Sequence, residues 1–174
     1  MSSNKTLVSF DTVTFWHDEK RPLLKEVNFS VREGSKITIM GQNGAGKSTT
    51  MNMVCSLVKP TSGSVSVFGF DTNKNMDKIK GKIGYIPQEL ALHGNLKAWE
   101  NVELFTSLYH LKGNELKQAV DESLEFVGLS QQRNGYAKSF SGGMKRRLNI
   151  ACAIGHKPEL LIFEIISNKC DKTH

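Results

Sequence analysis

Residues 41–49 read Gly41-Gln42-Asn43-Gly44-Ala45-Gly46-Lys47-Ser48-Thr49. This loop matches the pattern G-x-x-x-x-G-K-[ST], which binds phosphate when it connects a strand to a helix. Glycines permit backbone angles that turn successive N–H groups inward around phosphate oxygens. The Lys47 ammonium can then reach the outer phosphates, and the Ser48 hydroxyl is placed to bind Mg²⁺. The alternative, a glycine-rich turn that only caps a helix, leaves Lys47 and Ser48 unexplained.

The residues on either side of this loop predict an α/β fold. Residues 37–40 are mostly apolar and run directly into Gly41, as expected of a central strand that is buried on both faces. Apolar residues then recur at helical spacing over residues 47–58. Short apolar runs bounded by glycine, proline, serine or charged residues predict further strands at 7–10, 27–31 and 65–68. A strand, a glycine loop, a helix and later strands imply a core with a parallel sheet.

The region from residue 89 to residue 140 has a different pattern and predicts a helical insert. Apolar residues recur at helical spacing from Trp99 to Leu108 and again from Val120 to Val127. A further helix is predicted over residues 141–154, and a second buried strand over residues 160–163.

The composition indicates one globular domain without a membrane span. The 174 residues suffice for one core, and no run approaches the roughly 20 apolar residues that cross a bilayer. The three cysteines are widely separated, which indicates a reducing compartment and no zinc site. The net charge of +6 suits a polyanionic partner. However, the longest basic cluster is only Lys145-Arg146-Arg147, without interleaved aromatic residues, so we expect a solvated helix face and no nucleic-acid site.

A second glycine motif narrows the class of protein, and it reads Ser139-Phe140-Ser141-Gly142-Gly143-Met144-Lys145-Arg146-Arg147-Leu148. It places the Ser141 hydroxyl and two glycines at the start of a helix, where N–H groups and the helix dipole attract an anion. Ser141 as a helix N-cap followed by permissive glycines is the purely structural alternative. The motif by itself leaves both interpretations open.

Together these landmarks resemble the ATP-binding-cassette (ABC) ATPases. The family's signature L-S-G-G-Q occurs here as Phe140-Ser141-Gly142-Gly143-Met144, which keeps the hydroxyl and both glycines. The loop at 41–49 resembles the family's Walker A segment, residues 85–88 (Tyr-Ile-Pro-Gln) its Q-loop, and residues 160–163 the apolar strand of its Walker B segment. The resemblance runs through most of the chain in unbroken order.

The resemblance implies a fold and a division of the chain. The fold would be an α/β P-loop NTPase core with a mainly parallel sheet, N-terminal antiparallel strands and a helical subdomain insert. Residues 1–174 would form a single ABC ATPase domain. Within it, 1–88 would be the ATP-binding core, 89–140 the helical subdomain, 141–164 the signature helix and Walker B strand, and 165–174 an atypical tail.

The resemblance also implies ATP and Mg²⁺ as cofactors. ATP would be held by Gly41, Gln42, Asn43, Gly44, Ala45, Gly46, Lys47, Ser48 and Thr49, with adenine stacked on Trp16. His17 is the alternative to Trp16. Ser48 and Gln88 would bind the metal, and Gln88 would also touch the attacking water, because an amide offers an oxygen without titrating.

The family's partners follow from the same resemblance. Two domains would pair head to tail in the presence of ATP, so that Ser141, Gly142 and Gly143 of one chain cover ATP held by the other. A transmembrane subunit or domain would be the second partner. The chain would be cytoplasmic and bound to the membrane surface through that partner.

The pattern departs from the family after residue 163. The family places an Asp for Mg²⁺ there and then a catalytic Glu, whereas this chain has Glu164 followed by Ile165. Isoleucine cannot accept a proton, and general-base assistance commonly contributes about 10²–10⁴-fold. Residues 166–174 match nothing that follows in the family, which predicts truncation after Walker B, exposed apolar sheet edges and marginal stability.

The sequence thus predicts the ATP-binding subunit of an ABC transporter, which in intact form would also hydrolyse ATP. As written, the chain is expected to bind MgATP and to turn it over slowly or not at all. One alternative is a soluble ABC ATPase, which would usually need a coiled-coil insert or a second cassette. The other is a non-catalytic ATP-binding module, which Ile165 favours.

Overall fold

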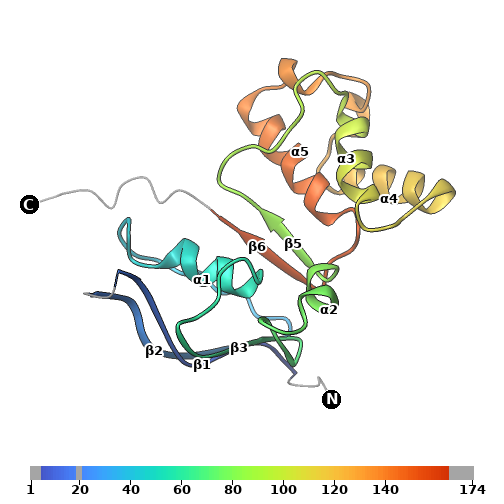
Figure 1. Ribbon diagram of the computed structural model, residues 1–174. Coiled ribbons are helices and arrows are strands. Elements are labelled where there is room, and N and C mark those ends of the chain that lie inside the picture. Colours follow the sequence, from blue (N-terminus) through green and yellow to red (C-terminus); the bar gives the residue numbers. More distant parts are fainter. Residues whose placement is uncertain (1–4, 19–20, 165–174) are drawn as a thin grey trace, which may run out of the picture. The chain divides into compact units, whose positions relative to one another are not determined.

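The computed structural model describes residues 5–18 and 21–164, which separate into two compact units (Figure 1). The first unit holds the described residues up to Lys80, and the second begins at Gly81. The predictions for Ile165 and for the tail at 166–174 lie outside the described residues. Among those that are described, no helix combines the length and the hydropathy that a bilayer span requires.

The first unit is built on a four-stranded antiparallel sheet in the order β2-β1-β3-β4. Its strands are β1 (Thr6–Asp18), β2 (Arg21–Arg32), β3 (Ser62–Val67) and β4 (Phe70–Asp71). Val8 and Phe10 of β1 and Val65 and Val67 of β3 are buried alternate residues, and an irregularity in the β1–β2 register between Phe10 and Val13 allows Val13 to be buried as well. The strands predicted at 7–10, 27–31 and 65–68 are confirmed, although β1 and β2 extend further as one long hairpin.

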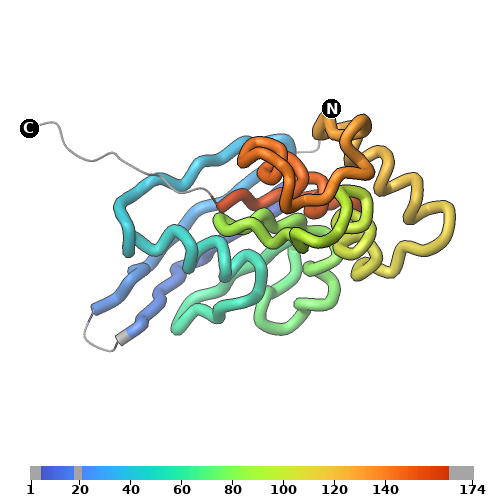
Figure 2. Tube along the Cα trace, turned by 90° about the horizontal axis from the view of Figure 1, so that it is seen from above, coloured from blue at the N-terminus to red at the C-terminus, as the bar shows by residue number. Residues whose placement is uncertain are grey.

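Two helices complete this unit: α1 (Lys47–Val54) and α2 (Met76–Lys80). Helix α1 lies beside the sheet and contacts β3, as Figures 1 and 2 both show. Its inward side chains include Met53 and Val54, which are buried. The helix ends earlier than residue 58, because Ser56 has a φ of +59°, a left-handed conformation that interrupts the helical backbone.

The strand predicted at residues 37–40 is wrong for this structure. These residues have no strand pairing, and the exposed fractions are 54% for Ile37 and 83% for Met40. A central strand needs a hydrogen-bonded neighbour on each side. The sheet of the first unit pairs β1 to β4 only with one another and provides no such position.

The second unit combines a parallel strand pair with a layer of helices. Strand β5 (Ile83–Ile86) pairs in parallel with β6 (Leu160–Phe163), in register from Ile83 opposite Leu160 to Ile86 opposite Phe163. The helices are α3 (Ala98–Ser107), α4 (Gly113–Phe126) and α5 (Gly142–Ile154), with short 3₁₀ turns η1 (Ser130–Gln132) and η2 (Ala137–Ser139). The predicted helical region, the signature helix and the strand at 160–163 are confirmed.

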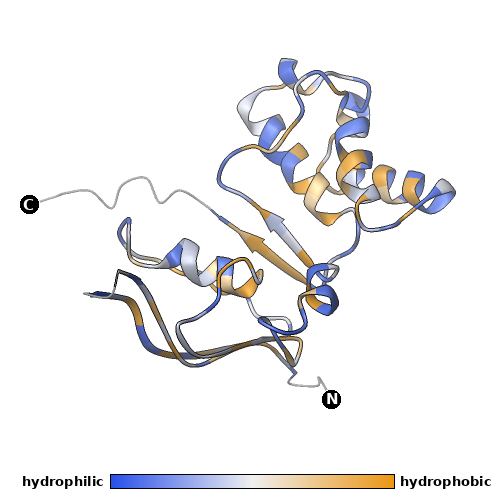
Figure 3. Ribbon diagram, in the orientation of Figure 1, coloured by the Kyte–Doolittle hydropathy of each residue, from blue (hydrophilic) through white to orange (hydrophobic). Residues whose placement is uncertain are grey.

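The helices enclose one apolar core. Val102 of α3, Val120 and Leu124 of α4, and Leu148 and Ala151 of α5 are its central members, and each is at most 2% exposed. By contrast β6 is apolar along its whole length (Figure 3), yet Leu161 and Phe163 are 40% and 39% exposed. The expected burial of this strand is therefore wrong, because β5 is its only paired neighbour in the described chain.

Two close contacts fix the start of α3 and the approach of α3 to α5. The fully buried Asn101 accepts a hydrogen bond from the His93 N–H at 2.8 Å, and its Nδ2 donates to the carbonyls of His93, Leu96 and Lys97. At the end of α5, a Cβ added to Gly155 would lie 2.0 Å from Thr106 Oγ1. The Gly155 backbone therefore packs directly against the Thr106 side chain of α3.

A half-buried imidazole lies where the helices meet the strand pair. The His156 ring stacks on Tyr109 with centroids 3.5 Å apart, and its Nε2 lies 3.1 Å from the Ile83 carbonyl. Nδ1 is buried without a hydrogen-bond partner in the structure. Burial lowers the pKa of His156 below its ordinary value of 6.5, although the Ile83 carbonyl partly opposes this.

We expect the free energy of unfolding to fall as the pH is lowered from 7.5 through 6.5. Below 6.5 the imidazole is protonated first in the unfolded chain, so unfolding takes up a proton until the lower folded-state pKa of His156 is reached. Urea unfolding at pH 7.5, 6.5 and 5.5 measures this slope. His156→Gln should reduce the dependence of the unfolding free energy on pH. His110→Asn, which replaces an exposed histidine, should leave this dependence unchanged. An equal slope in His156→Gln and the unmodified chain would contradict this assignment.

Candidate functional site

The glycine loop of the first unit leads directly into α1. Gly44 and Gly46 have φ values of +81° and +84°, the left-handed region that favours glycine. Gly46 is also buried, and a Cβ added there would lie 2.8 Å from Leu24 Cδ2. Position 46 therefore requires glycine for its backbone angle, and a larger residue would also have to displace the end of the Leu24 side chain.

The N-terminal end of α1 fits an anion. Its N-cap Gly46 provides no side-chain acceptor, and its first turn contains no acidic residue. In contrast, the first turn of α3 contains Glu100, whose carboxylate accepts the Lys97 N–H at 2.7 Å. The positive end of the α1 dipole thus faces the loop without a protein carboxylate to neutralise it, which suits a phosphate group.

The Lys47 side chain is folded over the loop. Its ammonium donates to the carbonyls of Gly41 and Gln42 at 2.7 and 2.8 Å. Carbonyl oxygens carry only partial charge, so a phosphate oxygen can replace them as a stronger, charge-assisted acceptor. The ammonium is therefore already located at the loop where a phosphate would need it.

The position of Ser48 suits a metal held jointly with a nucleotide. Ser48 lies in the first turn of α1, and its side chain is exposed. Among residues 5–18 and 21–164, no three His, Cys, Asp or Glu side chains gather as a metal site. Mg²⁺ commonly combines one or two protein oxygens with phosphate oxygens and water, and a single hydroxyl fits that pattern.

The two candidates for stacking adenine lie next to each other on β1. Trp16 is 38% exposed, and its backbone N–H donates to Thr61 Oγ1 at 3.2 Å. The ring of His17 is also exposed and meets the ring of Phe15 edge to face at 5.0 Å. The ring contact places the Phe15 and His17 side chains on the same face of β1.

A second group of predicted residues gathers at the carboxyl edge of the β5–β6 pair. Gln88 follows β5 by two residues and is exposed. Glu164 directly follows β6, and its N–H donates to the Ile86 carbonyl at 2.9 Å. Its carboxylate accepts the Tyr85 hydroxyl at 2.7 Å. Parallel strands therefore bring Gln88 and Glu164 to the same edge, the position at which α/β sheets commonly bind ligands.

Arg146 connects these residues to α5. Its Nη1 donates to the Gln88 carbonyl at 3.1 Å and more distantly to that of Pro87 at 3.5 Å, while Nη2 donates to the Glu164 carbonyl at 3.3 Å. Arg147 likewise donates to the Val127 and Gly128 carbonyls, at 3.1 and 3.3 Å. The prediction of a solvated basic face is wrong for Arg146, which is partly buried against these carbonyls, whereas Arg147 is exposed as predicted although it also contacts backbone carbonyls.

The signature segment combines a structural cap with an open surface. Ser141 is the N-cap of α5, and its hydroxyl accepts the Met144 N–H at 3.3 Å, so the structural alternative is confirmed for the hydroxyl. Gly142 and Gly143 are exposed, and a Cβ added to either would meet no atom within 4 Å. The chain's own packing therefore does not require glycine at these two helical positions.

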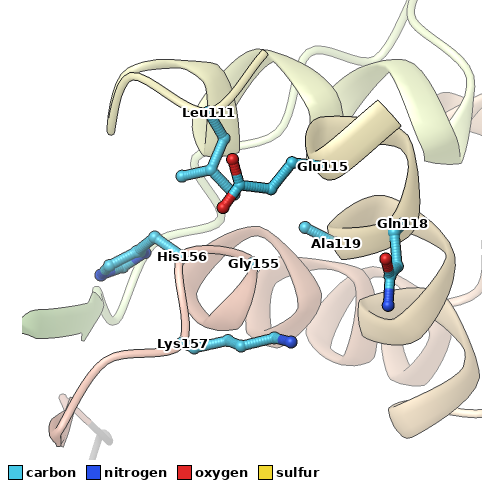
Figure 4. A pocket seen from close by; sticks show the side chains of 7 residues that line it. All are labelled: Leu111, Glu115, Gln118, Ala119, Gly155, His156 and Lys157. Atoms are coloured by element: carbon cyan, nitrogen blue, oxygen red, sulfur yellow. The ribbon is translucent and has the colours of Figure 1, made fainter. Parts of the chain in front are cut away.

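A shallow hollow lies at the opposite end of α5, between that end and α4 (Figure 4). Leu111, Glu115, Gln118, Ala119, Gly155, His156 and Lys157 line it. Lys157 pairs with the Glu122 carboxylate at 2.8 Å across this region, and both side chains are largely in water. The hollow contains none of the residues that the sequence predicted to be functional.

Comparison with known proteins relates this geometry to one family. A family model described as ABC transporter matches residues 24–164. The linearmycin resistance ATP-binding protein LnrL of Bacillus subtilis (strain 168) is 44% identical over 145 residues, covering 83% of this chain and 47% of that protein. The bacitracin transport ATP-binding protein BcrA of Bacillus licheniformis is 41% identical over 145 residues, covering 83% and 46%.

A solved structure agrees with these relatives. The dimeric structure of a post-hydrolysis state of the ATP-binding cassette MJ0796, bound to ADP and Pi, superposes with a TM-score of 0.77 at 32% identity, covering 90% of this chain and 73% of that chain. This similarity supports the α/β fold class predicted from the sequence. The chain spans less than half the length of the two curated relatives.

Proposed function

Because the chain belongs to the ABC transporter family, we propose that it is the ATP-binding part of a transporter that moves a substrate across a membrane. The observation that carries the proposal is the position of the Lys47 ammonium, 2.7 and 2.8 Å from two loop carbonyls beside an α1 N-terminus that has no acidic residue in its first turn. A positive helix end and a mobile cation next to it suit a triphosphate.

In this proposal the loop from Gly41 to Thr49 surrounds the phosphates with main-chain N–H groups, and Lys47 transfers its hydrogen bonds from carbonyl to phosphate oxygens. The Ser48 hydroxyl and the Gln88 amide oxygen hold Mg²⁺, and Trp16 or His17 stacks on adenine. Mg²⁺ supplies charge neutralisation at the phosphates when it is bound. The Glu164 carboxylate, which accepts the Tyr85 hydroxyl, is the acidic group at the same strand edge as Gln88.

The proposal includes two protein partners. A second ABC domain would approach head to tail, so that Ser141, Gly142 and Gly143 cover the partner's ATP. The open space around both glycines supports such an approach, because a side chain there would occupy room that the chain itself leaves empty. A transmembrane subunit or domain would hold the pair at the cytoplasmic face of the membrane. We propose the division into a core at 1–88, a helical subdomain at 89–140 and a signature and Walker B segment at 141–164 on the same basis.

Substitution of the signature glycines Gly142 and Gly143 should weaken self-association without lowering the stability of the folded chain. Gly142→Ala and Gly143→Ala are expected to leave the free energy of unfolding unchanged or to raise it by up to about 1 kcal/mol each, because alanine favours a helix and meets no atom. Both should weaken ATP-dependent self-association, measured by analytical ultracentrifugation with MgATP. Gly128→Ala, at a φ of +67°, is a control for a glycine that the backbone does require. Unweakened self-association of the Gly143→Ala chain would argue against the signature role.

Titration calorimetry of the folded chain with MgATP tests the proposed function. We expect saturable heat and a rise in unfolding temperature with ATP concentration, since a ligand that binds only the folded state stabilises it. The proposal would be rejected if millimolar MgATP produced no binding heat and no rise in unfolding temperature.

A non-catalytic ATP-binding module is the second candidate, and Ile165 favours it. An isoleucine at the position of the family's catalytic base removes proton abstraction without removing the phosphate loop. Phosphate release by pure protein distinguishes the two candidates. Little or no release alongside clear MgATP binding supports the module, whereas sustained release that depends on Lys47 excludes it.

A further inference from the structure

We propose that Arg146 is a positioning residue that fixes Gln88 and Glu164 relative to each other at the carboxyl edge of the β5–β6 pair. This inference rests on the proposed function for its consequence, because Gln88 and Glu164 act there on a nucleotide-bound cation. The contacts themselves lie within the second unit, on residues that all belong to it.

The Arg146 guanidinium connects the segments that follow β5 and β6, just beyond the last backbone hydrogen bond between them. In the described chain, the last backbone hydrogen bond between these segments runs from the Glu164 N–H to the Ile86 carbonyl. Just beyond it, Nη1 of Arg146 holds the Gln88 carbonyl at 3.1 Å and Nη2 holds the Glu164 carbonyl at 3.3 Å. One planar side chain thus replaces the next rung of the ladder and determines where both following residues lie.

The chemistry of these contacts explains why an arginine is suited to the position. The acceptors are carbonyls on two separate segments, and a guanidinium presents donors in a rigid fork that reaches both at once. A lysine ammonium is a single point on a flexible stem and would hold the two segments less rigidly. The position lies on α5, whose N-cap is Ser141, so the same helix carries the signature segment and this fork.

Arg147 provides a matched control on the same helix. It also donates to two carbonyls, those of Val127 and Gly128, but these follow α4 and lie outside the strand ends. Replacing either arginine by glutamine removes one positive charge and one guanidinium from α5. Only Arg146→Gln removes the connection between Gln88 and Glu164.

Hydrogen exchange of the full chain, resolved by amide and measured without nucleotide, tests the geometry. In Arg146→Gln we expect the Glu164 amide, which donates to the Ile86 carbonyl, to exchange about tenfold faster, which corresponds to the loss of one or two contacts that hold a segment closed. In Arg147→Gln this amide should be unchanged, and the Gly128 amide, which donates to the Glu125 carbonyl, should exchange faster. Unchanged exchange at 164 in Arg146→Gln would overturn the proposal, as would an equal increase throughout the second unit.

Nucleotide binding tests the consequence. Arg146→Gln should weaken binding of ATP with Mg²⁺ about tenfold while leaving binding of ATP in EDTA unchanged, and Arg146→Lys should restore part of the loss. Equal weakening with and without Mg²⁺ would show a general structural role and overturn the positioning role. If the unmodified chain binds no ATP, the proposed function fails, and the exchange experiment still decides whether Arg146 fixes the strand ends.

Discussion

A Lys47→Ala chain is expected to bind MgATP on the order of 100-fold more weakly than the unmodified chain. Hydrogen bonds to charged partners contribute roughly 1.5–3 kcal/mol, and about 2.7 kcal/mol corresponds to 100-fold in Kd. The Lys47 ammonium already lies at the loop, bonded to the carbonyls of Gly41 and Gln42, so little ordering of its side chain opposes the transfer to phosphate. Alanine removes the cation and leaves the main-chain N–H groups in place. Titration calorimetry or a fluorescent ATP analogue measures the change.

Two companion variants make this result specific. Lys36→Ala removes the same charge from an exposed position in the same unit and should change the Kd less than about threefold, because an exposed charge is screened by salt. Lys47→Arg keeps the charge and should retain part of the affinity. Urea unfolding should show a loss in the Lys47→Ala chain below about 1 kcal/mol, since its partners are exposed carbonyls. Unchanged nucleotide affinity in this variant would remove the phosphate loop from the proposal.

An Asn101→Ala chain is expected to lose about 3–5 kcal/mol of unfolding free energy. Asn101 is fully buried, and its amide satisfies the N–H and carbonyl of His93 together with the Leu96 and Lys97 carbonyls. Alanine leaves the buried His93 N–H without its acceptor and removes the second donor from the carbonyls of His93, Leu96 and Lys97, which each keep a backbone N–H donor. Because unpaired buried polar groups are costly, the segment before α3 should loosen together with the helix. Equilibrium urea unfolding measures the change.

Asn149 is a matched control for this effect. It is buried to a similar extent on α5, but its Nδ2 has no hydrogen-bond partner in the structure. Asn149→Ala removes a side chain of the same size without breaking contacts of that Nδ2, so its loss should be less than half that of Asn101→Ala. Equal losses in the two variants would show that volume, not the hydrogen bonds of Asn101, determines the stability.

The elements of this fold that depend on local pattern were predictable from the sequence. The strand at 160–163 matches β6 residue for residue, and Ser141 caps α5 as its position before two glycines indicated. The glycine loop also leads into α1 at the predicted Lys47. For the cap and the loop the determining interactions lie within a few residues, so spacing alone specifies them. For β6 the run of apolar residues indicated a strand, but its pairing with β5 is a distant interaction.

Features that depend on distant neighbours were not predictable in this way. Residues 37–40 are apolar enough for a buried strand, but a strand forms only where another strand offers hydrogen bonds, and sequence spacing does not report that neighbour. Arg146 lies about 160° around the helix axis from the buried Leu148, at 100° per residue, which predicts exposure to solvent. Its carbonyl partners come from segments up to 59 residues away, so only the fold reveals them.

The contact between Gly155 and Thr106 has a mechanical consequence for α3 and α5. Since no side chain separates the end of α5 from the fully buried Thr106, there is no compressible layer to absorb a push on α3. A displacement of α3 should therefore move α5 as a rigid body, because the side chains between the two helices cannot repack to absorb the movement. Such a movement would reach the far end of α5, where Ser141 begins the helix.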